Sequence, residues 1–238
     1  MKPNDQCLEV WGDFACFTRP ELKVERFSYP VITPSAARGI YDAIYCKPKE
    51  FRWQITKVEI LSLPKYIALR RNEVNGVAST QNAAKWMTGK PAKPLMADDD
   101  RIREQRQTLA LRGVKYRLHA EIRPWSEYAD RLPAFESQFR RRASAGKCVY
   151  QPYFGCREFP AYFKPVGPGE FAEPAIQYDD HNLGWVLYDV YDLSQPGTSE
   201  SPCQISLFQP VITGGVVEVP DYMDDAVRRS AKEVSRVT

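Results

Sequence analysis

The clearest hydrophobic pattern in the chain is a strict alternation along residues 114–122. Apolar side chains occupy every second position, and Lys115, Arg117 and His119 lie between them. Successive side chains of a strand point to opposite faces of a sheet. Residues 108–122 are therefore predicted to form a half-buried strand with one apolar face and one charged face.

Helix and strand signals also mark the rest of the N-terminal part. Thr33 can cap a helix whose first position is Pro34, and Pro48 should end that helix nearby. Gly12 interrupts an aromatic, alternating segment, which predicts a bulge or a close backbone approach there. The predicted order is a strand at 6–17, a helix from Thr33 to about Lys47, strands at 51–63 and 108–122, a helix at 133–145 and a strand at 148–154.

This order predicts an α+β protein with a ferredoxin-like, RRM-like domain over residues 1–154. An insertion at about 64–107, rich in Lys, Arg and Asp, is expected to be irregular. Residues 155–238 are predicted to form a smaller antiparallel β domain. Within it, Gly214-Gly215 lies between short apolar pairs and predicts a hairpin, and residues 221–235 predict a polar terminal helix.

Composition narrows the classes of function. With 43% hydrophobic and 12% aromatic residues, the chain can bury a core, which excludes global disorder. Its 33 Lys and Arg are nearly balanced by 30 Asp and Glu, so the net charge is only +3. Contact with nucleic acid must therefore come from local clusters of cations.

The cysteines and histidines predict no metal site. No two of the six cysteines form a Cys-x-x-Cys pair, and His119 and His181 are far apart. No P-loop or Gly-x-Gly-x-x-Gly motif indicates a nucleotide cofactor. Residues 1–5 lack the apolar run of a signal peptide, and no apolar stretch reaches the ~18–20 residues of a membrane span. We therefore expect a cytoplasmic protein that uses no cofactor and contacts no membrane.

Three groups of residues, each containing cations, are candidates for RNA contact. The charged face of the 108–122 strand is one, and its alternative is a solvated face of an antiparallel sheet. The helical stripe Arg38, Tyr41 and Tyr45 is another, and its alternative is packing against the sheet. The third group consists of loop cations that suit phosphates but alternate with glutamates, namely Arg19, Lys23, Arg26, Arg70 and Arg71.

Several strings of residues carry a specific resemblance: Gly12–Glu21, Lys23–Arg26, Thr33–Ile40, Ala43–Pro48, Arg70–Val74 and Gly155–Pro160. They are similar to Cas family five of the type I-C CRISPR systems, in the variants labelled d and c. The resemblance implies a RAMP-type ferredoxin-like N-terminal domain followed by a smaller C-terminal sheet.

The resemblance also implies an activity. Members of the family cut CRISPR precursor RNA at the base of the repeat hairpin and then stay on the 5′ handle of the crRNA in the interference complex. The implied partners are the repeat RNA, other Cas subunits and double-stranded DNA. The implied catalytic residues are Tyr45, Lys115 and His119. RNA contacts are expected from Arg19, Lys23, Arg26, Arg38, Arg70, Arg71, Arg117 and Arg157.

Such cleavage requires no metal, because the nucleophile is the 2′-hydroxyl of the RNA itself. Its attack expels the 5′-oxygen and leaves a 2′,3′-cyclic phosphate and a 5′-hydroxyl. The protein then supplies a base, an acid and a cation that stabilises the negative charge of the phosphorane. Histidine ordinarily titrates nearest neutrality, so His119 is the expected acid or base and Lys115 the cation. Tyr45 is expected to act as a base, or to orient the 2′-hydroxyl, if nearby cations lower its pKa.

Two other interpretations remain open from the sequence. The chain can be a non-catalytic scaffold that clamps crRNA and target DNA with the same cations. Binding of either kind depends steeply on salt, so product chemistry is needed to separate the scaffold from the enzyme. The other interpretation is a structural subunit that recognises only neighbouring Cas proteins, which predicts no RNA affinity for the isolated chain.

Overall fold

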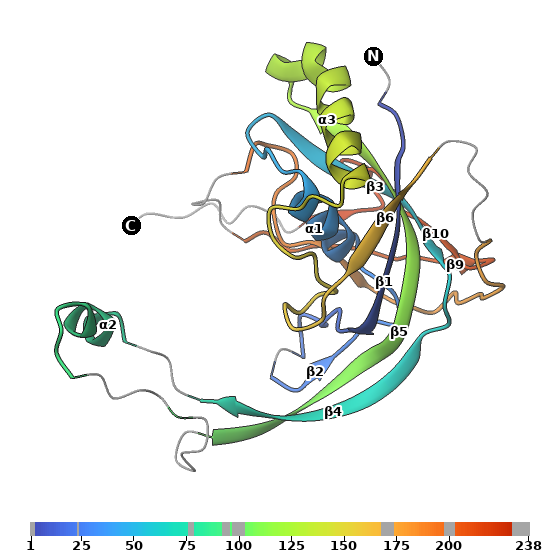
Figure 1. The fold of residues 1–238 in the computed structure, drawn as a ribbon. Helices are drawn as coiled ribbons and strands as arrows, with labels where there is room; N and C mark the ends of the chain where they lie inside the picture. Colours follow the sequence, from blue (N-terminus) through green and yellow to red (C-terminus); the bar gives the residue numbers. More distant parts are fainter. Residues whose placement is uncertain are drawn as a thin grey trace, which may run out of the picture.

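The structure, a computed structural model, describes residues 3–22, 24–75, 79–91, 96, 103–167, 174–197 and 203–229. Its strands are β1 (Gln6–Ala15), β2 (Arg26–Phe27), β3 (Phe51–Ile60), β4 (Lys65–Val74), β5 (Arg103–Pro124), β6 (Tyr162–Val166), β7 (Val186–Asp189), β8 (Ser206–Phe208), β9 (Ile212–Thr213), β10 (Val216–Glu218) and β11 (Arg228–Arg229). Its helices are α1 (Pro34–Ile44), α2 (Thr80–Met87), α3 (Leu132–Ser144) and the 3-10 helix η1 (Ser126–Arg131). This content confirms the predicted α+β class (Figure 1).

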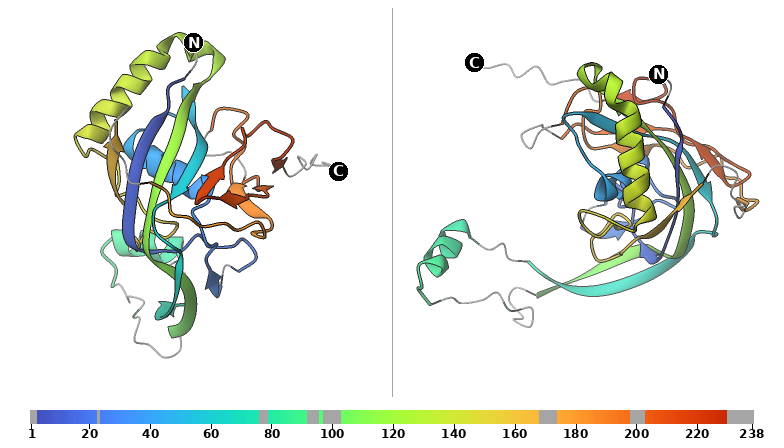
Figure 2. Two further views of the ribbon diagram at one scale, coloured as in Figure 1. Left: turned by 90° about the vertical axis from the view of Figure 1, so that its right-hand side faces the viewer. Right: turned by 45° about the horizontal axis from the view of Figure 1, so that its top comes forward.

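A large sheet of eight strands forms the centre of the molecule. Its order is β6-β1-β5-β3-β10-β9, and β2 and β4 also pair with β5. The β2–β5 pairing is parallel and the other pairings in this sheet are antiparallel. A second sheet contains β11, β8 and β7. Helix α1 packs on one face of the large sheet. It lies behind the strands in the left view of Figure 2, which looks onto the opposite face.

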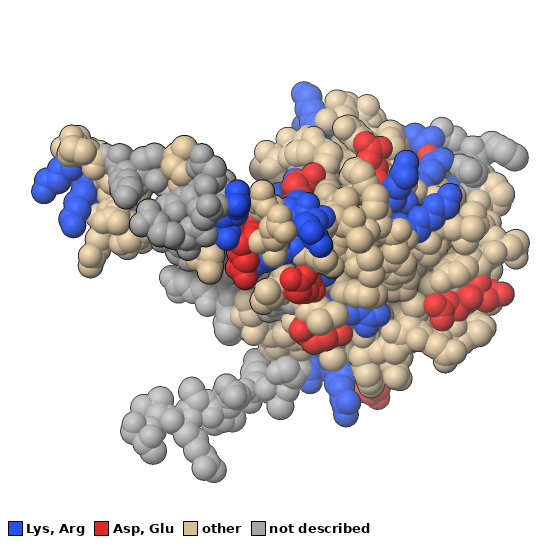
Figure 3. All heavy atoms as spheres, turned by 90° about the horizontal axis from the view of Figure 1, so that it is seen from below, with Lys and Arg blue, Asp and Glu red and all other residues tan. Residues whose placement is uncertain are grey.

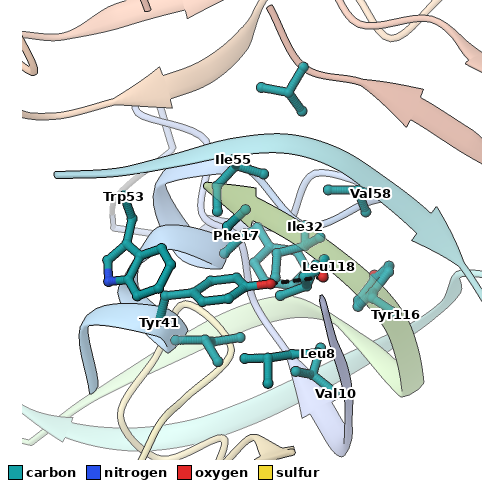
Figure 4. Packing of buried hydrophobic residues seen from close by; sticks show 14 of the residues in the cluster. Leu8, Val10, Phe17, Ile32, Tyr41, Trp53, Ile55, Val58, Tyr116 and Leu118 are labelled. Carbon is teal, nitrogen blue, oxygen red and sulfur yellow. Dashed lines mark hydrogen bonds between the residues drawn. The ribbon is translucent and has the colours of Figure 1, made fainter. Parts of the chain in front are cut away.

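Helix α1 forms where its capping residues predict it. The Thr33 hydroxyl accepts a hydrogen bond from the Ala36 N–H (3.2 Å), and Pro34 occupies the first position. The hydroxyl of Tyr41 lies 2.7 Å from the Gln6 carbonyl oxygen and 2.8 Å from that of Leu118. Because it donates to both neighbouring strands, it ties α1 to the middle of the sheet (Figure 4). Tyr41 therefore belongs to the core and not to an RNA surface.

The predicted irregular insertion is a long hairpin. β4 and the first part of β5 pair continuously from Lys65↔Arg112 to Val74↔Arg103, and we call this hairpin the arm. It extends away from the core, with α2 beyond its end (Figure 1). Beyond the point where β2 pairs with Thr108 and Leu109, only β4 and β5 form the arm, and polar residues such as Arg70 and Arg71 lie on its two faces. The alternation that reveals buried strands is therefore absent.

Two predicted elements are wrong. Residues 148–154 form bends with one isolated bridge between Tyr153 and Pro160, and β6 pairs with β1 in place of that segment. Pro152 has no N–H for a ladder, and Gly155 takes a φ of 79°, which suits a turn. The helix at 221–235 is also absent within its described part, where turns lead into β11. There the side chains of Asp221 and Asp224 accept backbone N–H groups that a helix would need, at 3.0 and 2.9 Å. Residues 230–235 lie outside the described part.

The predicted hairpin at Gly214-Gly215 is confirmed. Both glycines have positive φ, 57° and 75°, as a tight two-residue turn between β9 and β10 requires. β10 pairs with β3, so the large sheet receives strands from the C-terminal part of the chain as well as the N-terminal part.

Gly12 makes a close backbone approach, and the register of β1 against β5 stays continuous through it. A Cβ at this position would lie 2.7 Å from the Pro160 carbonyl oxygen and 2.9 Å from the Phe154 ring. Gly12→Ala is expected to lower the free energy of unfolding by about 1–3 kcal/mol through overpacking.

The matched control is Gly39→Ala, because nothing lies within 4 Å of its Cβ position in α1. That change should stabilise by about 0.5–1 kcal/mol in urea unfolding. Equal effects of the two changes would refute the close approach.

Candidate active site

The charged face of β5 lies on the side of the large sheet away from α1, which we call the open face. Apolar residues of β5 such as Leu118 are buried against α1, so alternation places Lys115, Arg117 and His119 on the other side. Strand pairing brings further side chains beside them on this face: Cys7, Glu9 and Trp11 of β1, Lys57 and Glu59 of β3, and Tyr162 and Lys164 of β6. The left view of Figure 2 looks onto these strands.

Carboxylates neutralise much of the positive charge on the open face. Arg117 lies 2.5 Å from Glu59 and 4.0 Å from Glu9, and only 6% of it is exposed. Glu9 also pairs with Lys115 at 3.3 Å and with Lys164 at 3.2 Å. The row is therefore neither a solvated face nor a set of unpaired cations. Arg117 is held within the sheet face, and the lysines reach farther into solvent.

Both ring nitrogens of His119 lie against carboxylates. Nδ1 is 2.6 Å from Asp5 Oδ2, and Nε2 is 3.1 Å from Glu59 Oε1. The Cys7 Sγ is 3.9 Å from Nε2, and burial, with the charge of Asp5, raises the pKa of this thiol to about 12. A proton transfer between His119 and RNA would require one of the carboxylate contacts to break.

The ion pairs of the open face predict a pH-dependent stability. Burial alone would raise the pKa of Glu59, but the hydrogen bond and charge of Lys57, with the nearby cations of β5, hold it below its usual range. A carboxyl with a lowered pKa stabilises the fold above its unfolded pKa, about 4.3, and loses this contribution as the pH falls through the folded value. Glu59→Gln should therefore destabilise near neutral pH. Urea unfolding in acid should show the two proteins converging, and a gap that stayed constant would contradict the pairing.

Tyr45 lies on the opposite side of the sheet, at the end of α1. Its ring centroid is 5.3 Å from that of Phe51, and its carbonyl oxygen accepts a hydrogen bond from Trp53 Nε1 at 2.8 Å. Only 9% of Tyr45 is exposed. Burial raises its pKa even though neighbouring cations act to lower it. The condition set for Tyr45 to act as a base, a pKa lowered by nearby cations, is therefore not met, and its hydroxyl stays protonated at neutral pH.

Three cations near Tyr45 come from helix ends. Lys47 follows the end of α1, Arg131 lies where η1 meets α3, and Arg142 is in the last turn of α3. Lys47 and Arg131 both pair with Glu50, at 2.7 and 2.9 Å. Arg142 of α3 donates from Nε to the Ile44 carbonyl oxygen at 2.6 Å, which holds α3 against the end of α1. All three cations act electrostatically on Tyr45. We call Tyr45, Lys47, Arg131 and Arg142 the helix-end cluster.

A cavity of about 460 Å³ opens near the helix-end cluster. Phe51, whose ring contacts Tyr45, lines it together with Cys46, Lys49 and Trp125. Its size falls within the range of small-ligand sites, and its walls combine aromatic rings with cations. The helix-end cluster meets this cavity only through Phe51, because none of its four residues forms part of the cavity wall.

The structure does not bring the three predicted catalytic residues together. Tyr45 lies with the helices, and Lys115 and His119 lie across the sheet on the open face. The alternation of 114–122 contained the signal for this separation, because a helix packs on the apolar face of such a strand. Arg131 and Arg142 were missed as neighbours of Tyr45, since the contact joins residues far apart in sequence.

Arg38 is structural. Its guanidinium makes two hydrogen bonds to the Asp189 carboxylate (2.7 and 3.0 Å) and one to Asp42 (2.5 Å). Asp189 is almost fully buried, and the pair joins α1 to β7. Burial alone would lower the pKa of Arg38, but the two carboxylates raise it, so the residue remains charged.

The remaining predicted RNA contacts lie around the arm and neighbouring loops. Arg26 and Arg71 share the carboxylate of Glu158, at 3.3 and 2.5 Å. The charge of Glu73 also acts on Arg26, so carboxylates face both cations along the arm. Arg70 is exposed on the opposite face of the arm from Arg71, and Arg157 is exposed beside Glu158.

Arg19 lies with its guanidinium over the Tyr29 ring, 4.6 Å from the centroid, and 3.8 Å from Glu21. Lys23 lies outside the described residues. Seen from below the arm, Lys and Arg side chains are interspersed with Asp and Glu and do not gather into one patch (Figure 3). On this face the cations therefore form small local clusters.

The helices of the described residues include none with the length and apolar character of a membrane span.

Comparison with known proteins decides the family. The family model for the CRISPR-associated protein Cas5, in its Cas5d form, matches residues 7–220. The chain belongs to the Cas5d family. This confirms the resemblance drawn from the sequence.

Two curated Cas5d relatives match most of the chain. One, from Thermus thermophilus, is 42% identical over 193 residues, which cover 81% of this chain and 76% of the relative. The other, from Mannheimia succiniciproducens, is 36% identical over 230 residues, 93% of this chain and 97% of the relative. Each bears the name CRISPR pre-crRNA endoribonuclease Cas5d.

Two solved structures share the fold. A crystal structure of a CRISPR-associated protein matches with a TM-score of 0.61 and 21% identity, covering 94% of this chain and 96% of that chain. A functionally uncharacterized protein from Streptococcus mutans matches with a TM-score of 0.60 and 19% identity, covering 94% and 97%. At these identities the likeness concerns the fold alone.

Proposed function

We propose that the chain is an endoribonuclease that cuts CRISPR precursor RNA. The observation that carries the proposal is its 42% and 36% identity to two Cas5d proteins named as pre-crRNA endoribonucleases. The cut falls at the base of the repeat hairpin, and the protein then stays on the 5′ handle of the crRNA. Other Cas subunits and target DNA are its further partners in the interference complex.

The reaction is an in-line transesterification. The 2′-oxygen forms a bond to the adjacent phosphorus, the bond from phosphorus to the 5′-oxygen breaks, and one proton passes from the 2′-hydroxyl to the leaving 5′-oxygen by way of an acid and a base. Charge builds up on the phosphorane oxygens, so preorganised cations lower the barrier. The RNA supplies the nucleophile, and metal is not required to generate one.

The helix-end cluster is the proposed site of this reaction. Tyr45 keeps its proton at neutral pH, so its hydroxyl is assigned as the acid that protonates the leaving 5′-oxygen. The proton of the 2′-hydroxyl passes to water, and solvent returns a proton to Tyr45. Lys47 and Arg131 lie where they can neutralise the phosphorane, and Glu50 holds both in place.

The open face is the second candidate site. The resemblance implies Lys115 and His119, and histidine is the residue most often used for acid and base catalysis. The contacts from Asp5 and Glu59 to both ring nitrogens weigh against this assignment. Lys115 and His119 are therefore proposed to contribute to RNA binding, and catalysis is assigned to the other side of the sheet.

Incubation of the purified protein with its own repeat RNA in EDTA tests the function. We expect one cut near the hairpin base, with a 2′,3′-cyclic phosphate on the upstream product and a 5′-hydroxyl on the downstream product. A 3′-hydroxyl with a 5′-phosphate, or cleavage that appears only when divalent metal is added, would refute this chemistry. Tight binding without any cut would favour the non-catalytic scaffold.

We also propose a ferredoxin-like arrangement for the N-terminal part. The succession β1, α1, β3, β5, α3 and β6 has the strand–helix–strand–strand–helix–strand order of that fold. The neighbour order β6-β1-β5-β3 supports it. In that fold the first and third strands along the chain, here β1 and β5, lie in the centre of the sheet. A boundary near residue 154 and a cytoplasmic location remain predictions.

A further inference from the structure

Two large aromatic side chains are exposed side by side on the open face. Trp11 of β1 is 38% exposed and Tyr162 of β6 is 52% exposed. Their ring centroids are 6.3 Å apart and their planes are inclined by 29°, so the rings are stacked. The register pairs Trp11 directly with Tyr162. Neither residue is needed by the cleavage proposed for the helix-end cluster.

Lysines flank the two rings. Trp11 pairs in register with Lys115 of β5, and the next outward-facing position of β6 after Tyr162 is Lys164. The Lys115 and Lys164 side chains are 33% and 58% exposed, and both share Glu9 as a carboxylate partner. Glu9 thus lies between the two lysine ammonium groups, one outward-facing residue pair along the strands from the rings. The face thus presents flat aromatic surface beside groups that attract phosphate.

We propose that Trp11 and Tyr162 form a stacking platform for unpaired nucleobases of the RNA that the protein binds. The proposal rests on the proposed function in that RNA is the ligand. Every nucleobase has a flat face that can stack on an aromatic ring, and proteins bind single strands by alternating such rings with cations along the backbone. The platform therefore recognises unpaired nucleotides outside the repeat hairpin and tolerates changes in their sequence.

The surroundings of the rings favour RNA over a protein partner. A protein-binding patch is depleted of charge at its centre, and Lys is depleted across it. Here Lys115 lies directly beside Trp11, and Lys164 is more than half exposed. The exposed ring of Trp185 provides a contrast, because the guanidinium of Arg228 already lies over it at 5.3 Å.

Binding of a short single-stranded RNA without a hairpin tests the platform. The wild-type protein, Trp11→Ala, Tyr162→Ala and the control Trp185→Ala are titrated against the labelled RNA, and circular dichroism checks that each is folded. Loss of a stacked base is expected to weaken binding by about 5- to 150-fold in the first two variants and not in the control. Trp11→Phe and Tyr162→Phe should retain most of the affinity, because each keeps a ring.

The outcomes separate the platform from the proposed cleavage. Suppose that the wild-type protein cleaves repeat RNA, and that Trp11→Ala and Tyr162→Ala bind single-stranded RNA as tightly as the wild type. That result would overturn the platform but not the proposed cleavage, and it would assign the rings to a protein contact. Ring-dependent binding without cleavage by the wild-type protein would support the platform while the enzyme proposal fails. Quenching of tryptophan fluorescence by RNA, lost in Trp11→Ala and kept in Trp185→Ala, is the expected independent signature.

Discussion

Replacing Tyr45 by phenylalanine is expected to lower the single-turnover rate of repeat-RNA cleavage by about 10²–10⁴-fold, the usual contribution of a positioned acid or base. Phenylalanine keeps the ring that packs on Phe51 and removes only the hydroxyl. RNA affinity and the urea midpoint should therefore change little. Measurement of the rate at saturating protein separates the chemical step from binding.

The contrast with the open face makes this prediction specific. His119→Ala and Lys115→Ala remove the two other residues that the family resemblance implies, and both lie across the sheet from Tyr45. Each is expected to slow the single-turnover step by less than about tenfold, within the effect of altered RNA placement. A large loss in His119→Ala with normal cleavage by Tyr45→Phe would move the reaction to the open face.

Replacing Arg38 by alanine is expected to lower the free energy of unfolding by about 3–5 kcal/mol, because it leaves the Asp189 carboxylate buried without its cation. The Asp189 side chain is only 1% exposed, and the Arg38 side chain 16%. Two backbone N–H groups still donate to Asp189, at 2.8 and 3.0 Å, but neither carries a full positive charge. Urea unfolding gives the value directly.

A double-mutant cycle distinguishes this pairing from a general loss of packing. Arg38→Met with Asp189→Leu replaces both charges by apolar side chains and should recover much of the stability lost in the single variants. If the two single effects simply added, the ion pair would not be what joins α1 to β7.

The fold was predictable where one face of an element is buried. The alternation of 114–122 located the central strand, and Thr33 with Pro34 located the start of α1, because burial and capping both leave local traces in sequence. The end of the arm left no such trace, since polar residues lie on both of its faces. The segments at 148–154 and 221–227 were wrong because backbone turns, held by Gly155 and by aspartate side chains, outweighed the local pattern.

The candidate site was predictable only in part. The resemblance pointed to Tyr45, but its cations Arg131 and Arg142 come from residues nearly a hundred positions away, and no local pattern reports such a contact. Arg38 was predicted only as an RNA contact, and its ion pair with Asp189 left no local sign because Asp189 lies on a distant strand. The exposed stack of Trp11 and Tyr162 likewise depends on the pairing of β1 with β6, which the sequence did not indicate.

Cleavage of a repeat RNA that carries a single 2′-deoxynucleotide immediately 5′ of the cut tests the proposed reaction most directly. The assay runs in EDTA beside the unmodified RNA, and both RNAs are first shown to bind equally. We expect the unmodified RNA to be cut once and the deoxy-substituted RNA to remain intact, since its nucleophile is missing. Cutting of both RNAs at the same site would contradict attack by the 2′-hydroxyl, and cutting of neither would contradict an endoribonuclease that works without metal.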